Sequence, residues 1–322
     1  MPTHHAIAPA LLQFTAALIL FCLSAAAPAA PAGQQHDVIN VTSLDAPAGA
    51  VVLLPGRWFA AAPSTTAPAL AHGAVLPAPA PALAPALVLM HGCGGPYDAR
   101  GRLAERYTAL AARLNTLGVH VLVLDSFTPR GQKQICTQLT GQRSITQQQR
   151  RRDALGALQW LAGPAGRERG GDATRLGLLG WSNGGSTVLA AINQRHPEVA
   201  AALVRPSVAV AFYPGCEVES ARGFEPVAPL LMLLGELDDW TPPGPCKVLA
   251  AAVPATGPAV QWESYAGAYH GFDGNAPLRL RRDVPNGVNP GQGVHVGSEP
   301  AARAASALRL DRFLQETWNL RP

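Results

Sequence analysis

The pattern of apolar residues is most regular after residue 86. Short continuous apolar runs recur there and predict strands that are buried on both faces. These runs lie at 86–92, 119–126, 175–180, 207–214 and 229–236, and a less buried strand is expected at 261–267. The stretches between them predict helices over 102–118, 147–163, 185–196 and 299–318. Strands that alternate with helices in this way predict an α/β fold with a mostly parallel central sheet and helices on both faces.

The chain before residue 86 has a different pattern. Residues 31–47 are polar and predict an extended segment, whereas 50–61 predict a first strand. Residues 62–86 are dominated by Ala and Pro, which prevents a helix and indicates a loop or an irregular edge hairpin. We therefore expect an N-terminal segment over 31–85 and a catalytic core over 86–322.

The first 30 residues are typical of an export signal. An apolar stretch over 9–27 is followed by small residues, as in a signal peptide that is cleaved near residue 30. The stretch has no Lys or Arg before it, and an uncleaved membrane anchor is the alternative. The prediction is a periplasmic or secreted protein with no stable membrane insertion after the signal is removed.

Composition and charge exclude some function classes. The chain is 48% apolar and 14% charged, with a net charge of +4, which is too weak to indicate binding to nucleic acid. The one basic cluster, Arg150-Arg151-Arg152, is interpreted as a solvated helix face. The histidines and cysteines lack the spacing of a metal site, and no phosphate loop or dinucleotide motif is present, so no metal or cofactor is expected.

Four cysteines follow the signal segment, and an even number in an exported chain indicates disulfides. Three pairings are possible. We favour Cys93–Cys136 and Cys216–Cys246, because each would join loops at one end of the sheet. Buried free thiols are the alternative.

The candidate nucleophile is Ser182 in "GWSNGG", between a predicted strand and a predicted helix. Gly-X-Ser-X-Gly in this context predicts a nucleophile elbow, and a plain Gly-rich turn is the alternative. Further along the chain, "GELDDWTP" offers Asp238 and Asp239, and "AYHGF" offers His270. The order Ser, Asp, His is that of α/β-hydrolases. His295 is the main competitor of His270, which we prefer because it follows a strand.

An attacked ester develops negative charge on its carbonyl oxygen, which backbone N–H groups usually stabilise. We expect these donors to be Asn183, next to the serine, and Cys93 in "HGCGG". A tight strand-to-helix turn is the alternative interpretation of "HGCGG".

The motifs "HGCGG", "LDSFTPRG", "GWSNGG", "GELDDWTP" and "AYHGF" together resemble the dienelactone hydrolase family of α/β-hydrolases, over roughly residues 86–318. The resemblance implies that the acid is Asp238 and the base is His270. Dienelactone hydrolase itself is known for a cysteine nucleophile, so Ser182 departs from it, and the substrate implied is a small ester or lactone.

Four further residues are candidates for substrate binding. Arg130 either pairs with a substrate carboxylate or with Asp125 or another acid of the protein. Trp181, Tyr213 and Trp240 are candidate walls of the pocket. The sequence thus predicts an exported serine hydrolase of esters or lactones, with a peptidase resembling the prolyl oligopeptidase relatives, or a non-catalytic binding protein, as alternatives.

Overall fold

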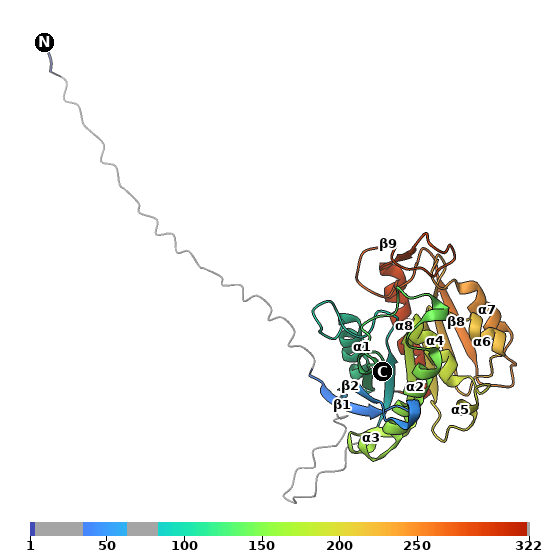
Figure 1. The fold of residues 1–322 in the computed structure, drawn as a ribbon. Coiled ribbons are helices and arrows are strands. Elements are labelled where there is room, and N and C mark those ends of the chain that lie inside the picture. The colour runs from blue at the N-terminus through green and yellow to red at the C-terminus, as the bar shows by residue number, and fades with distance from the viewer. Residues whose placement is uncertain (4–34, 63–82, 321–322) are drawn as a thin grey trace, which may run out of the picture. The chain divides into compact units, whose positions relative to one another are not determined.

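The computed structural model describes residues 1–3, 35–62 and 83–320 (Figure 1). The chain divides into two units, 1–33 and 34–322, and every helix and strand of the described residues lies in the second. The expected signal peptide, apart from its first three residues, and most of the Ala/Pro-rich segment lie outside the described residues. No helix in the described ranges is both long and apolar enough to cross a membrane.

The centre of the fold is an eight-stranded sheet with the strand order β1-β2-β4-β3-β5-β6-β7-β8. Neighbouring strands from β4 to β8 in this order are parallel, and β1 and β2 are joined antiparallel at one edge. The strands are β1 (Asp37–Thr42), β2 (Leu53–Phe59), β3 (Ala84–Met90), β4 (His120–Leu124), β5 (Gly171–Trp181), β6 (Val208–Phe212), β7 (Leu230–Gly235) and β8 (Val260–Tyr265).

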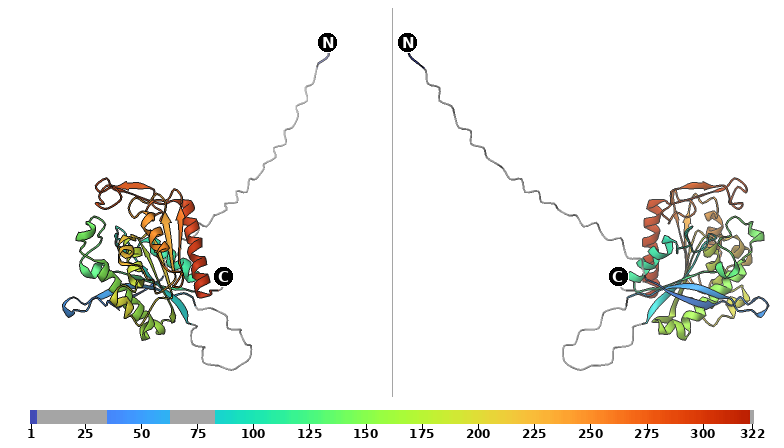
Figure 2. Two further views of the ribbon diagram at one scale, coloured as in Figure 1. Left: turned by 90° about the vertical axis from the view of Figure 1, so that its right-hand side faces the viewer. Right: turned by 60° about the vertical axis from the view of Figure 1, so that its left-hand side comes forward.

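Helices cover both faces of this sheet (Figure 2). The α-helices are α1 (Glu105–Thr116), α2 (Gln147–Ala162), α3 (Pro164–Glu168), α4 (Asn183–Ile192), α5 (Pro197–Ala200), α6 (Glu217–Arg222), α7 (Pro243–Ala251) and α8 (Pro300–Trp318). Short 3₁₀ turns lie at Pro47–Gly49, Thr128–Arg130 and Thr140–Gln142. A separate two-stranded hairpin pairs β9 (Arg279–Arg281) with β10 (Val294–Val296).

The continuous apolar runs supply both layers of the core. Along β3, Ala86, Val88 and Met90 pack on the side of α2, α4 and α7, while Leu87 and Leu89 pack on the side of α1 and α8. Because successive side chains of a strand point to opposite faces, such a strand must be apolar at every position. The predicted α/β fold with a mostly parallel sheet and helices on both faces is confirmed.

The segment expected to be an extended tail contains β1. Ile39 and Val41, two residues apart, are 7% and 0% exposed and join the core. Polar residues flank this alternation, and it is too short to predict a strand from the sequence. The brief helices α3, α5, α6 and α7 and the β9–β10 hairpin were also not predicted, since segments this short show little periodicity.

One expectation about α2 is wrong. Arg150 and Arg151 are 0% and 6% exposed, so the three arginines are not a solvated face. Helix α2 packs against α4 and the sheet, which buries this side of its first turns. Arg151 and Arg152 pair with Glu198, and Arg152 also reaches Asp45.

Candidate active site

Ser182 lies in a strained turn between β5 and α4. Its φ of 52° and ψ of −120° fall where an L-residue with a side chain is disfavoured by roughly 1–3 kcal/mol. A Cβ atom at Gly180 would lie 2.2 Å from the carbonyl oxygen of Gly184, and one at Gly184 would lie 2.0 Å from that of Met90. Both glycines are therefore required for the turn to close, and the turn presents Ser182 at the carboxyl edge of the sheet.

Asp238 and His270 form a buried pair at the same edge. Nδ1 of His270 lies 2.9 Å from Oδ2 of Asp238, and the two side chains are 4% and 0% exposed. Asp238 follows β7 and His270 follows β8, so neighbouring strands bring them together. The other carboxylate oxygen, Oδ1, accepts the N–H groups of Trp240 and Thr241 at 2.9 Å each. These bonds fix the orientation of the carboxylate.

Thr241 is a member of this group that sequence reasoning missed. Its Oγ1 lies 3.1 Å from Nδ1 of His270 and 3.1 Å from Oδ2 of Asp238, and it donates to the carbonyl oxygen of Tyr213 at 2.9 Å. The only sequence signal is its place three residues after Asp238, which is common for a turn that an aspartate closes.

The competing histidine has an aspartate of its own. Nδ1 of His295 lies 2.7 Å from Oδ2 of Asp239, and the backbone N–H of His295 donates to Oδ1 at 2.8 Å. These side chains are 41% and 28% exposed. This second pair ties β10 to the loop after β7.

Ser182 and the buried pair follow strands of the same parallel part of the sheet, at its carboxyl edge. The N–H of Ser182 donates to the carbonyl oxygen of Phe212 at 2.9 Å, and Phe212 is the last residue of β6, the strand between β5 and β7. The next residue, Tyr213, packs its ring against His270 with 4.5 Å between ring centroids. The segment that follows β3 also lies next to Ser182, since a Cβ atom at Gly92 would be 3.7 Å from Cβ of Ser182.

The segment after β3 offers backbone donors beside the serine. Within the described ranges, neither the N–H of Cys93 nor that of Asn183 donates a hydrogen bond to another residue. Asn183 is the first residue of α4, where helix N–H groups have no partner within the helix. The fold therefore does not use either of these N–H groups as a donor.

His91 shapes this segment but is inaccessible to a substrate. Its ring is fully buried, with Nδ1 at 2.8 Å from the carbonyl oxygen of Gly92 and Nε2 accepting the N–H of Ser126 at 3.3 Å. Burial, and then the charge of Arg150, hold the pKa of His91 well below its usual range. The ring therefore stays neutral and serves to fix the turn.

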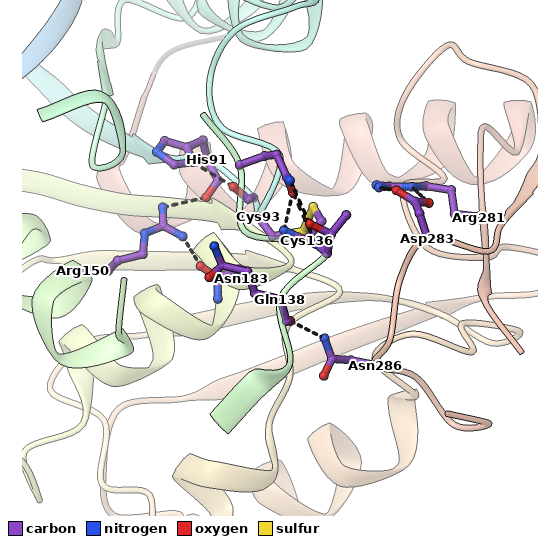
Figure 3. Close-up of a disulfide and its surroundings, with 12 residues drawn as sticks. His91, Cys93, Cys136, Gln138, Arg150, Asn183, Arg281, Asp283 and Asn286 are labelled. Carbon is purple, nitrogen blue, oxygen red and sulfur yellow. Dashed lines mark hydrogen bonds and ion pairs between the residues drawn. A yellow bond between two sulfur atoms is a disulfide. The ribbon is translucent and has the colours of Figure 1, made fainter. Parts of the chain in front are cut away.

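Among the residues that the structure describes there are two disulfides, Cys93–Cys136 and Cys216–Cys246, the pairings that the sequence analysis favours. The first joins the segment after β3 to the loop after β4 (Figure 3). The N–H of Ile135 also donates to the carbonyl oxygen of Cys93 at 2.8 Å. Cys93 is thereby held by both a covalent and a hydrogen bond.

Arg130 is a structural residue. It donates to Asp45 at 3.0 Å and to both oxygens of Asp153 at 2.9 Å, and its side chain is 10% exposed. These two buried acids occupy the guanidinium, so the substrate-binding interpretation does not hold. The alternative, that Arg130 pairs with an acid of the protein, is confirmed, and the acids are Asp45 and Asp153 in place of Asp125.

The three aromatic candidates differ in position. Trp181 is 1% exposed and donates to Asp273 at 2.8 Å. The hydroxyl of Tyr213 donates to the same Asp273 at 2.6 Å and accepts a bond from Arg106 at 2.7 Å, so its polar group is already paired within the protein. Trp240 alone is partly exposed, with its ring centroid 4.6 Å from that of His270.

A cleft of about 670 Å³ lies between α1 and α8, where Trp181, Arg106 and Asp273 form part of its wall. Among the described residues, its lining includes Gly271 beside His270 but neither Ser182 nor His270 itself. In the same part of the chain, no three His, Cys, Asp or Glu side chains lie together so as to hold a metal ion.

Comparison with known proteins identifies the family and the fold. A sequence model described as the dienelactone hydrolase family matches residues 73–312. No curated protein matches the chain in sequence. Thermogutta terrifontis esterase 2 phosphorylated by paraoxon is similar in structure at 16% identity, with a TM-score of 0.57, over 91% of this chain and 98% of that chain.

Two further structures of that thermophilic esterase, native and propionate-bound, are each 17% identical with a TM-score of 0.54. They cover 90% of this chain and 94% and 96% of those chains. At these identities the likeness shows a shared fold, the α/β-hydrolase fold.

Proposed function

Because the chain belongs to the dienelactone hydrolase family, and is therefore a hydrolase of carboxylic esters, we propose that it acts through a Ser182–His270–Asp238 triad. The observation that carries this proposal is that the buried Asp238–His270 pair and the strained Ser182 lie at the same carboxyl edge of the sheet. Buried acid–base pairs and strained backbone both concentrate at functional sites. The substrate that we propose is a small carboxylic ester or lactone.

The reaction proceeds in two halves. The hydroxyl oxygen of Ser182 bonds to the acyl carbon while its proton passes to Nε2 of His270. The bond to the leaving alcohol then breaks, and His270 gives that proton to the departing oxygen. Water attacks the acyl-serine, its proton passes to His270, and the proton returns to Ser182 as the acid is released.

The remaining residues serve this proton transfer. Asp238, at 2.9 Å from Nδ1, keeps Nε2 directed to the serine and stabilises the imidazolium that forms. The N–H groups of Cys93 and Asn183 donate hydrogen bonds to the negatively charged carbonyl oxygen, and such stabilisation is usually a large part of the rate enhancement. The rings of Tyr213 and Trp240 flank His270 and limit its movement.

The similar structures support a test with organophosphates. Thermogutta terrifontis esterase 2 is phosphorylated by paraoxon and binds propionate. We propose that paraoxon likewise phosphorylates Ser182 of this chain and releases p-nitrophenol. Dienelactone is not proposed as the natural substrate, because this chain carries a serine where dienelactone hydrolase is known for cysteine.

The experiment is a panel of p-nitrophenyl esters of increasing acyl length, simple lactones and peptide amides, with Ser182→Ala as the matched control. We expect ester or lactone turnover by the wild type and loss of at least 10⁴-fold in the variant. Preferential release of amines from the peptides would support a peptidase. Saturable binding without turnover would support a binding protein.

We also propose that the chain is exported, with residues 1–30 removed as a signal peptide, and that residues 86–322 form the catalytic core, to whose sheet β1 and β2 add two strands at one edge. Two disulfides are compatible with an oxidising compartment. Intact mass of the protein recovered from a host that exports it tests this directly. The expected mass lacks the first 30 residues or so, whereas a full-length mass with membrane association would indicate an anchor.

A further inference from the structure

Arg150 is a buried cation that the proposed mechanism does not use. It is 0% exposed, and its terminal nitrogens donate to two neutral oxygens. Nη1 donates to Oδ1 of Asn183, and Nη2 donates to the carbonyl oxygen of His91 at 2.7 Å. Its Nε is buried without a hydrogen-bond partner among the described residues.

This placement is unfavourable for a charged group. A guanidinium removed from water is normally paired with a carboxylate, as Arg151 on the same helix is paired with Glu198. Burial lowers the pKa of Arg150 to about 10, which still leaves it protonated near neutral pH. Stability alone therefore gives no reason for an arginine here.

The two oxygens bound by Arg150 belong to the two segments of the proposed oxyanion hole (Figure 3). His91 lies two residues before Cys93 in the segment after β3. Asn183 itself carries the second N–H donor and begins α4. Arg150, which lies in α2, thus connects the segment after β3 with the segment after β5.

The same helical turn contacts Asn183 a second time. Nε2 of Gln147, three residues before Arg150, donates to the carbonyl oxygen of Asn183 at 3.1 Å. A capping box formed by Thr146 and Gln149 fixes the start of α2. The guanidinium also lies 5.1 Å from the ring centroid of Phe127, which packs on its face.

We propose that Arg150 is a positioning residue for the oxyanion hole, which sets the spacing of the N–H groups of Cys93 and Asn183 by binding both segments with one guanidinium. This inference rests on the proposed esterase function. A guanidinium suits the task because it is planar and rigid and holds its nitrogens at fixed separations. Its charge also lies where it stabilises the developing oxyanion.

The test compares Arg150→Met and Arg150→Lys with Arg151→Met, a matched control that removes a buried arginine from the same helix away from Ser182. For each protein we would measure kcat and KM on a p-nitrophenyl ester, the inhibition constant of an alkyl boronic acid, and the thermal unfolding temperature. The boronic acid forms an anionic tetrahedral adduct with the serine and so reports on the oxyanion hole.

We expect Arg150→Met to lose about 10²-fold in kcat per folded enzyme, with KM changed little, as when one oxyanion donor is lost. The affinity of the enzyme for the boronic acid should fall in parallel with kcat/KM. Arg150→Lys should recover only part of the loss, because one ammonium cannot reproduce the two-point geometry. Arg151→Met should keep kcat and boronic acid affinity within threefold of the wild type.

A second variant covers the case in which Arg150→Met does not fold. Asn183→Ala keeps the backbone N–H but removes Oδ1, the oxygen that Arg150 binds, and should lower kcat about 10-fold with the same parallel loss of boronic acid affinity. An unchanged boronic acid affinity in the variants that fold would overturn the inference. A wild type that neither turns over esters nor binds the boronic acid would instead overturn the proposed function.

Discussion

The molecule contains two aspartate–histidine pairs, built from neighbouring aspartates, that differ in burial. Asp238–His270 has side chains that are 0% and 4% exposed, and Asp239–His295 has side chains that are 28% and 41% exposed. The first connects the ends of two core strands, and the second fastens the β9–β10 hairpin. An exposed pair of this kind contributes little, because water and salt screen it.

The difference shows that an acid–base pair is defined by its surroundings more than by its two residues. The distances are 2.9 Å in the buried pair and 2.7 Å in the exposed one, so distance alone does not favour the pair that we propose. Tyr213, Trp240 and Thr241 enclose His270. His295 has a ring contact with Tyr269, and its side chain is 41% exposed.

The largest expected effect separates the two histidines. His270→Gln removes the proposed base and should lower kcat/KM on an ester by about 10⁵-fold or more. His295→Gln should remain within about threefold of the wild type. Steady-state kinetics of both variants test this prediction. A large loss of kcat/KM in His295→Gln but not in His270→Gln would assign the catalytic role to the exposed pair.

The aspartates sharpen the comparison. Asp238→Asn should lower kcat by about 10⁴-fold, because the amide cannot stabilise the imidazolium or hold its orientation. Asp239→Asn should change kcat by less than threefold and loosen only the hairpin. The measurement is kcat of both variants. A larger loss of kcat in Asp239→Asn than in Asp238→Asn would contradict the account.

The two disulfides extend the comparison from side chains to backbone. They close loops of similar length, 43 and 30 residues, so replacing either pair with alanine should lower the free energy of unfolding by about 4 kcal/mol. Only loss of Cys93–Cys136 should also reduce kcat, by about 10-fold to 100-fold, since it displaces a proposed oxyanion donor. Urea unfolding and kcat measured on folded protein separate the two effects, and equal losses of kcat in both variants would contradict the role of Cys93.

The smallest effect concerns Thr241, which has no counterpart in the exposed pair. Thr241→Val keeps the shape of the side chain but removes the hydroxyl that contacts both Asp238 and His270. We expect kcat to fall roughly 10-fold, with KM nearly unchanged. A wild-type kcat in this variant would show that the backbone bonds to Asp238 suffice to orient the pair.

The sequence predicted the fold because the buried strands are continuous apolar runs, and such runs have few other interpretations. It also predicted that Ser182, Asp238 and His270 lie at the carboxyl edge, since each is within five residues of the end of a parallel strand. The sharp turn at Ser182 was predictable from the glycines around it, because the backbone leaves no room for a Cβ atom at Gly180 or Gly184; its role as nucleophile stays a prediction.

The sequence could not distinguish Asp238 from Asp239 by pattern, because adjacent residues share the same context and only the fold assigns each its histidine. Arg150 was misinterpreted for a related reason. Three consecutive arginines are typical of a solvated face, and only the packing of α2 under the ends of β3 and β5 shows that the first is buried. The role of Arg130 could not be assigned from the sequence for a similar reason. Its partners Asp45 and Asp153 lie far from it along the chain, and only the fold brings them to it.

The most direct test of the account is the intact mass of the purified protein after treatment with a fluorophosphonate, for the wild type, Ser182→Ala, His270→Gln and His295→Gln. The account predicts a single adduct on the wild type and on His295→Gln, none on Ser182→Ala, and greatly slowed labelling of His270→Gln. An unlabelled but folded wild type, or an adduct that persists in Ser182→Ala, would contradict the claim that the buried pair activates Ser182.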